Sequence, residues 1–276
     1  FLSFEEEHMV KKVLAAFPRV AVVLNTGGMM DTLWFKDNPA VGAALLAWQG
    51  GMEGAMAEAD ILCGDVNPSG KLTDTFAASF DDYPSSAGFN ESRDHVCYTE
   101  DIFVGYRYFE TIPGAAEKVN YPFGFGLSYT TFRLEPLISQ GDDESISVTV
   151  RVTNTGNTAG REVVQVYSSA PQCRLDMPKL ELRAFQKTRL LQPGQAQELT
   201  LTFPTAELAA YDEKLAAFVL PAGSYTILVG NCVRALEKVG HFVNEAERIT
   251  EQVKNRCVPA KLPRRLKADG SFEDLK

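Results

Sequence analysis

The chain has 276 residues, of which 45% are hydrophobic and 23% charged, and this composition excludes a disordered or collagen-like protein. Its length suits one large globular domain or two ordinary ones. The net charge of −9 argues against general binding to nucleic acid, because neutralising phosphates needs clustered lysine and arginine. No apolar run reaches the roughly 20 residues of a membrane-spanning helix, so we expect no contact with a membrane.

The first segment predicts a helix followed by a strand. Ser3 and Glu6 have the spacing of a capping box, in which each side chain accepts a hydrogen bond from the other residue's backbone amide. Apolar residues recur at helical spacing up to Phe17, and Pro18 marks the end of the helix. The continuous apolar run at residues 20–24 is typical of a strand buried on both faces of a parallel sheet.

The same alternation repeats once. The sequence predicts a short helix at residues 30–36, an apolar strand at 43–48, a turn at 49–51 and a second helix at 53–62. Alternating helices and strands indicate an α/β fold. From residue 67 to about 127 the chain is irregular and rich in glycine, proline and aromatic residues, as in loops that serve function or contact another domain.

Beyond Phe132 the hydrophobic pattern changes to period two. Apolar and polar side chains alternate through residues 145–153, which predicts an antiparallel strand with one buried face. Further strands, separated by turns, are predicted at residues 163–167, 183–190, 197–203, 217–220 and 223–229. About seven short strands within roughly 110 residues predict an all-β sandwich of the immunoglobulin-like type.

The last segment differs in composition. Residues 252–276 hold seven Lys or Arg against three Asp or Glu, so the preceding residues sum to a charge of −13. The segment 246–276 shows no sustained pattern, and we expect a basic linker or a solvated arm. Because the chain opens on Phe1 without a secretion signal, we expect a cytoplasmic protein and a cut made in a longer chain.

The five cysteines are odd in number and scattered along the chain, with few histidines near them. This pattern excludes a disulfide framework and a zinc site of ordinary spacing. We therefore expect buried, inert thiols, no metal and no cofactor. A cation site at Asp65 and Asn67 is one interpretation of this segment. The residues Asn67 to Gly70 favour a turn instead, because proline fixes its φ angle and glycine tolerates a positive φ.

Four segments carry a resemblance to a known family: residues 47–54 (AWQGGMEG), 64–72 (GDVNPSGKL), 98–109 (YTEDIFVGYRYF) and 121–132 (YPFGFGLSYTTF). In this order they resemble glycoside hydrolase family 3, the β-glucosidase and β-xylosidase family. Residues 152–156 and 162–167 are similar to the fibronectin type III-like domain that follows in many members.

The resemblance implies three parts. Residues 1–132 would form a C-terminal α/β-sandwich domain, with a mostly parallel sheet, an incomplete N-terminus and an interface loop. Residues 133–245 would form the fibronectin type III-like sandwich, and residues 246–276 a basic linker. Residues 256–259 and 264–271 resemble the connector of members in which a (β/α)₈ barrel follows the sandwich, so the linker would lead to such a barrel.

The resemblance also implies a reaction. Family members are retaining β-glycosidases, which cleave O-glycosidic bonds with two carboxylates about 5 Å apart. In the family the nucleophile is an aspartate on the barrel, and the acid/base glutamate precedes the helix that opens this sequence. Neither segment is matched here, so we expect part of a β-glucosidase that contains no catalytic residue and is inactive in isolation. Its partner would be a barrel domain, in cis or in trans, and its substrate a β-linked glucoside or, alternatively, a xyloside.

Three residues are the predicted edge of the substrate pocket. Glu53 begins a predicted helix at the carboxyl end of a parallel strand, where open α/β sheets bind ligands. A carboxylate at this position also gains about 0.3–1 kcal/mol from the helix dipole, so a purely structural role stays open. Trp48 and Gln49 share the turn and could meet the barrel, while a half-buried core position is the alternative for Trp48. Glu100 and Asp101 are adjacent carboxylates that we expect to bond Arg107 or backbone amides.

A non-catalytic carbohydrate-binding or adhesion module is the rival function, since β-sandwiches often bind without chemistry. Such modules present flat sets of exposed aromatic rings on their strands. The predicted sandwich has no tryptophan, and Tyr167, Tyr211 and Tyr225 stand at spacings that suit core packing or a tyrosine corner. The sequence therefore favours the enzyme part over the binding module.

Overall fold

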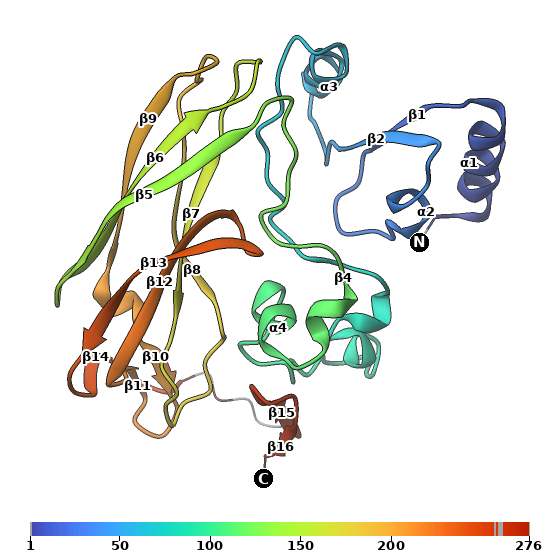
Figure 1. Cartoon of the computed structure of the whole chain (residues 1–276). Coiled ribbons are helices and arrows are strands. Elements are labelled where there is room, and N and C mark those ends of the chain that lie inside the picture. The colour runs from blue at the N-terminus through green and yellow to red at the C-terminus, as the bar shows by residue number, and fades with distance from the viewer. Residues whose placement is uncertain (1, 257, 259–261, 276) are drawn as a thin grey trace.

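The computed structural model describes residues 2–256, 258 and 262–275 as mixed sheets with few helices (Figure 1). Helix α1 (Phe4–Ala16) begins at the predicted capping box. The Glu6 amide donates to Ser3 Oγ at 3.2 Å, and the Ser3 amide donates to Glu6 Oε2 at 2.7 Å. The helix ends before Pro18, as its sequence predicts.

Strands β1 (Val20–Leu24) and β2 (Val41–Leu46) form a two-stranded parallel sheet, and the predicted parallel pairing is confirmed. Helix α2 (Leu33–Lys36) precedes β2, and α3 (Gly54–Cys63) follows it. Burial on both faces, predicted for β1, is wrong: Leu24 is its one buried residue, and α1 buries none. The sheet has only these two described strands, β1 and β2, and most of their residues are exposed or half-buried.

The irregular segment 67–131 builds a small core of its own. Strands β3 (Phe76–Ala77) and β4 (Val119–Tyr121) pair antiparallel, and helix α4 (Tyr106–Thr111) lies between them in sequence. Three short 3₁₀ helices complete it: Phe80–Asp82, Ser86–Gly88 and Ala115–Lys118. Buried Phe109 packs with Ala77 and Ala115, so the segment is more than a connecting loop.

Two antiparallel sheets follow and share one hydrophobic core. The first has the order β5-β6-β9 and the second β13-β12-β7-β8. Their bounds are β5 (Phe132–Gly141), β6 (Ser145–Asn154), β7 (Val163–Ser169), β8 (Glu181–Lys187), β9 (Ala196–Pro204), β12 (Gly223–Cys232) and β13 (Ala235–Asn244). Val150 of β6, Leu199 of β9 and Ile227 of β12 belong to the same buried cluster, so the sheets pack face to face.

The sequence pattern missed strands β5 and β13. Strand β5 contains Pro136, and its register with β6 shifts there, which interrupts the regular alternation. Strand β13 is an edge strand whose residues are mostly exposed or half-buried, so its sequence carries little hydrophobic signal. Both strands are evident only from their pairing, β5 with β6 and β13 with β12.

The last segment is not a patternless linker, and that expectation is corrected in its described part. Strand β14 (Arg248–Gln252) pairs with β11 (Ala217–Leu220), which pairs with β10 (Ala210–Asp212). Strands β15 (Arg264–Leu266) and β16 (Phe272–Asp274) form a hairpin near α4 (Figure 1). The short 3₁₀ helix Thr205–Leu208 connects β9 to β10.

The three tyrosines of the sandwich differ in environment. Tyr225 is fully buried, and its hydroxyl donates to the Pro221 carbonyl at 3.1 Å, the geometry of a tyrosine corner. Tyr167 is also fully buried and donates to Gln165 Oε1 at 2.7 Å. Tyr211 is 37% exposed, so the expectation of a core position is wrong for this residue.

The expectation of buried thiols is also wrong. Cys63 is exposed, and Cys97, Cys173 and Cys232 are half-buried free thiols. Cys257 lies outside the described residues.

Candidate functional site

The predicted pocket edge lies where the parallel strands β1 and β2 end. The Ala47 amide donates to the Leu24 carbonyl at 3.0 Å, so the two exit loops start side by side. The Gln49 side chain covers Gly27: a Cβ at Gly27 would lie 3.0 Å from Gln49 Nε2. The small residue therefore allows the two loops to approach closely.

Trp48 occupies a strained position in this edge. Its φ of 54° lies in the left-handed region, which a bulky side chain rarely adopts. Strain of this kind costs about 1–3 kcal/mol and is concentrated at functional sites. Trp48 is half-buried and Gln49 is exposed.

Glu53 is the N-cap residue of α3. Its carbonyl accepts the Ala57 amide at 3.1 Å, while its side chain makes no capping hydrogen bond. The carboxylate is exposed, and no hydrogen bond joins it to another part of the described chain. Trp48, Gln49 and Glu53 thus share one loop, and the neighbouring Met52, which sequence reasoning did not single out, is fully exposed.

Of the two partners expected for the adjacent carboxylates Glu100 and Asp101, a backbone amide is confirmed for Asp101, which accepts from Ile102, whereas Arg107 is bound elsewhere. Arg107 lies 3.5 Å from Glu181 of β8. Asp101 lies 3.9 Å from Arg265 of the C-terminal hairpin, and Glu100 is buried. Partial burial raises the pKa of Asp101, although the Arg265 charge opposes the shift.

A second set of residues, which sequence reasoning read as a turn, joins the first part of the chain to the β-sheets. Asn67 Nδ2 donates to the Ala159 carbonyl at 2.9 Å, and Asn67 Oδ1 accepts from Ser128 Oγ at 2.9 Å and from the Tyr129 amide at 2.8 Å. Ser128 and Tyr129 precede β5 in the chain, whereas Ala159 follows β6. Asn67 therefore fixes the junction between the two parts.

A buried ion pair completes this junction. Lys71 Nζ lies 2.9 Å from Glu162 Oε1, and the two side chains are 12% and 7% exposed. The Val163 amide and Asn231 Nδ2 also donate to the Glu162 carboxylate, at 2.7 and 2.9 Å. Lys71 further donates to the Gly126 carbonyl at 3.1 Å, so its charge is held by two segments.

Glycines allow the backbones to meet at the junction. A Cβ at Gly126 would lie 2.3 Å from the Gly70 carbonyl oxygen, closer than any real contact. A Cβ at Gly160 would lie 2.7 Å from Asn67 Nδ2. Close packing thus explains Gly126 and Gly160, whereas Gly70 itself has open space where a Cβ would lie.

Aromatic residues line the same contact. The Tyr106 ring lies 4.8 Å from Phe123 and 6.0 Å from Tyr167, and its hydroxyl accepts the Leu182 amide at 2.8 Å. Tyr98, in contrast, is exposed. The aromatic segments therefore supply part of the domain contact, with Tyr98 outside it.

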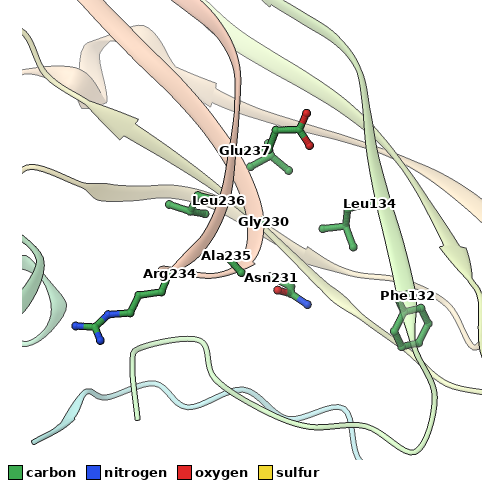
Figure 2. A pocket seen from close by; sticks show the side chains of 9 residues that line it. Phe132, Leu134, Gly230, Asn231, Arg234, Ala235, Leu236 and Glu237 are labelled. Carbon is green, nitrogen blue, oxygen red and sulfur yellow. The ribbon is translucent and has the colours of Figure 1, made fainter. Parts of the chain in front are cut away.

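A groove of about 380 Å³ lies beside the junction, between β5 and the turn that joins β12 to β13 (Figure 2). Phe132 and Leu134 of β5 face this turn. The Arg234 side chain points away from them and is bound by Glu110 at 2.8 Å, while Asn231 is held by Glu162. Arg234 and Asn231 of the groove thus take part in contacts between distant segments.

In the described part of the chain, no three His, Cys, Asp or Glu side chains come together as a metal site would require. None of the described helices combines the length and the apolar character needed to cross a membrane. A second carboxylate also reaches the loop that holds Glu53, because a Cβ at Gly50 would lie 3.6 Å from Glu58 Oε1.

Comparison with known families gives two matches in chain order. The model of the glycosyl hydrolase family 3 C-terminal domain matches residues 2–129, and that of the fibronectin type III-like domain matches residues 162–232.

Similar proteins cover nearly the whole chain. β-Glucosidase A of Butyrivibrio fibrisolvens is 49% identical and aligns with 100% of this chain, and a β-glucosidase of Ruminococcus albus is 39% identical over 99%. A β-glucosidase structure from Paenibacillus barengoltzii aligns with 99% of this chain at 40% identity and a TM-score of 0.89. β-Glucosidase 3B from Thermotoga neapolitana, in complex with glucose, aligns with 91% at 41% identity and a TM-score of 0.83.

All of these relatives are longer. The aligned part amounts to 36% and 29% of the two curated proteins, and to 32% and 35% of the two solved chains. The chain thus spans about a third of the length of the relatives that it matches. It belongs to glycosyl hydrolase family 3, of which it carries the C-terminal domain and the fibronectin type III-like domain.

Proposed function

We propose that this chain is part of a retaining β-glycosidase, a β-glucosidase, that hydrolyses O-glycosidic bonds in carbohydrate catabolism. The observation that carries the proposal is the 49% identity to a β-glucosidase in a match that covers the whole chain. Retention requires two carboxylates about 5 Å apart. The proposal assigns both of them to parts of the enzyme outside this chain, because the segments that carry them in the family are not matched in this sequence.

The proposal divides the chain into a partial α/β sandwich with a mostly parallel sheet at residues 1–132 and a fibronectin type III-like sandwich at residues 133–245. The parallel pairing of β1 with β2 and the shared core of the two antiparallel sheets support it. The pairing of β14 with β11 supports extending the second unit to Gln252. Residues beyond Gln252 would connect to a (β/α)₈ barrel.

Within the enzyme, the chain would shape one side of the substrate pocket and hold the domains together. Trp48, Gln49 and Glu53 would form the pocket edge, and the strained backbone of Trp48 supports this role. A barrel, supplied in cis or in trans, would cover the open faces of α1, β1 and β2. These elements expose Phe4, Met9 and Val23, apolar side chains that a domain contact would bury.

Activity measurements test this proposal. The isolated chain is expected to release no aglycone from an aryl β-glucoside, and mixing it with the remaining part of β-glucosidase A is expected to generate turnover. In the mixture, Glu53→Gln should change KM more than kcat, because the residue borders the pocket without acting on the bond. Turnover by the isolated chain that disappears in Glu53→Gln would instead make Glu53 a catalytic residue and overturn the proposal.

The rival carbohydrate-binding module is less well supported. Tyr211 and Phe218 are 37% and 38% exposed on neighbouring strands, but their rings are inclined by 56° and form no flat platform. Calorimetric titration of the full chain with cello-oligosaccharides distinguishes the two functions: binding lost in Tyr211→Ala would favour the module. Action on xylosides, the absence of nucleic-acid and membrane partners, and the cytoplasmic location stay predictions.

A further inference from the structure

The C-terminal hairpin β15–β16 contacts two distant parts of the chain. The Leu266 amide donates to the Thr99 carbonyl at 2.7 Å, and the Leu266 side chain is buried. Gly270 at the tip lies against Ile112, since a Cβ there would be 3.3 Å from Ile112 Cγ2. The hairpin therefore docks on the family 3 domain through one hydrogen bond and a small apolar contact.

Ion pairs tie the same hairpin to the fibronectin type III-like part. The Arg265 guanidinium lies 3.2 Å from Glu213 and 3.9 Å from Asp101, and Lys267 Nζ lies 3.0 Å from Asp176. Asp101 belongs to the family 3 domain, whereas Asp176 and Glu213 lie among the strands that follow it. Arg265 thus bridges carboxylates of both domains, and Lys267 adds a pair with the second domain.

The hairpin has little stability of its own. Its strands pair through three residues each, and Arg265 is joined to Glu273 at 3.0 Å. Arg264 lies 4.2 Å above the Phe272 ring. Because an isolated two-stranded hairpin is marginally stable in water, this one depends on its docking contacts.

Its ion pairs differ from the pair at the junction in their access to solvent. Arg265 and Lys267 are 27% and 37% exposed and their carboxylate partners 34–61%, whereas Lys71 and Glu162 are almost covered. Salt screens exposed pairs strongly and buried pairs much less. The domains are therefore joined at one contact that resists salt and at a second that responds to it.

We propose that the hairpin β15–β16 is a releasable clasp, which holds the loop around Thr99 to the fibronectin type III-like domain and opens when its ion pairs are screened. Opening frees the Leu266 amide and uncovers its side chain, while the junction at Lys71 stays closed. The clasp adjusts how rigidly the two domains are joined, independently of which glycoside the enzyme cleaves.

Hydrogen exchange of the full chain, followed by mass spectrometry, tests this clasp. Raising NaCl from about 0.1 M to about 1 M shortens the Debye length from about 10 Å to about 3 Å. Exchange of the peptide that contains Leu266 should then accelerate about tenfold, as expected from several exposed pairs acting together. Exchange within strand β7 should stay unchanged and serves as the internal reference.

Variants separate the ion pairs from general effects of salt. Arg265→Gln should exchange fast at Leu266 already in low salt and lose most of the salt response. Arg133→Gln, which removes an exposed pair with Glu135 at 3.3 Å, is the matched control and should behave as the parent chain. Salt-independent exchange at Leu266 in the parent chain, or an Arg265→Gln chain that exchanges like the control, would overturn the proposal.

Discussion

Replacing Lys71 by methionine tests the energetic importance of the domain junction. The substitution keeps much of the apolar side-chain volume but leaves the Glu162 carboxylate buried without its cation. Two hydrogen-bond donors, the Val163 amide and Asn231 Nδ2, remain and satisfy only part of the charge. The substitution Lys71→Met therefore removes mainly the electrostatic attraction between Lys71 and Glu162.

The expected magnitude follows from burial. Removing one partner of a buried ion pair costs about 3–5 kcal/mol, because an uncompensated charge is left out of water. For a protein of this size we expect Lys71→Met to lower Tm by about 6–12 °C. A second substitution, Glu162→Gln, should restore about half of the loss, because it removes the stranded charge.

Thermal unfolding followed by circular dichroism measures these differences. Arg151→Met is the matched control, because Arg151 and Glu198 form a pair of 2.6 Å whose side chains are 49% and 52% exposed. An exposed pair contributes about 0–1 kcal/mol, so the control should shift Tm by no more than about 3 °C. If Lys71→Met shifts Tm no further than the control, the buried pair is not what stabilises the junction.

Two further predictions concern close packing and pH. Gly126→Ala should destabilise the fold by about 1–3 kcal/mol in urea unfolding, since its Cβ would collide with the Gly70 carbonyl, whereas Gly28→Ala, with open space around it, should not. The Arg174 guanidinium and backbone amides lower the pKa of Asp212, so Asp212 stabilises the fold above its unfolded pKa of about 3.9, and this stability is lost as pH falls through the lowered value. Asp212→Asn should therefore be less stable than the parent chain at pH 7 and approach it in acid; an equal gap at both pH values would contradict this assignment.

Local features were readable in the sequence. The capping box of Ser3 and Glu6 and the alternation from Ile146 to Val152 act within a few residues, so their spacing predicts the elements directly. The loop between β2 and α3 was predictable for the same reason, because its residues are consecutive, while its role as a pocket edge stays a prediction. The strain at Trp48 was not predictable, since a left-handed tryptophan has no sequence signal.

Long-range features needed the tertiary structure. The turn predicted at Asn67 to Gly70 is wrong, since the turn and bend lie at residues 64–66, and no periodicity indicates that Asn67 bonds Ala159 and Ser128 or that Lys71 pairs with Glu162. The basic tail likewise gave no pattern, because strands that pair through three residues each are too short for a period to appear.

The sequence by itself determined the order of the domains, the first helix, most strands of the fibronectin type III-like part and the family resemblance, because each rests on residue types at short fixed spacings. The tertiary structure alone decided how the domains are joined. Their junction depends on a buried charge pair and on glycines that let two backbones touch, and the C-terminal hairpin depends on carboxylates from two domains. Such contacts arise from the meeting of surfaces that are distant along the chain, and their free energy depends on burial and distance, which spacing in the sequence does not encode.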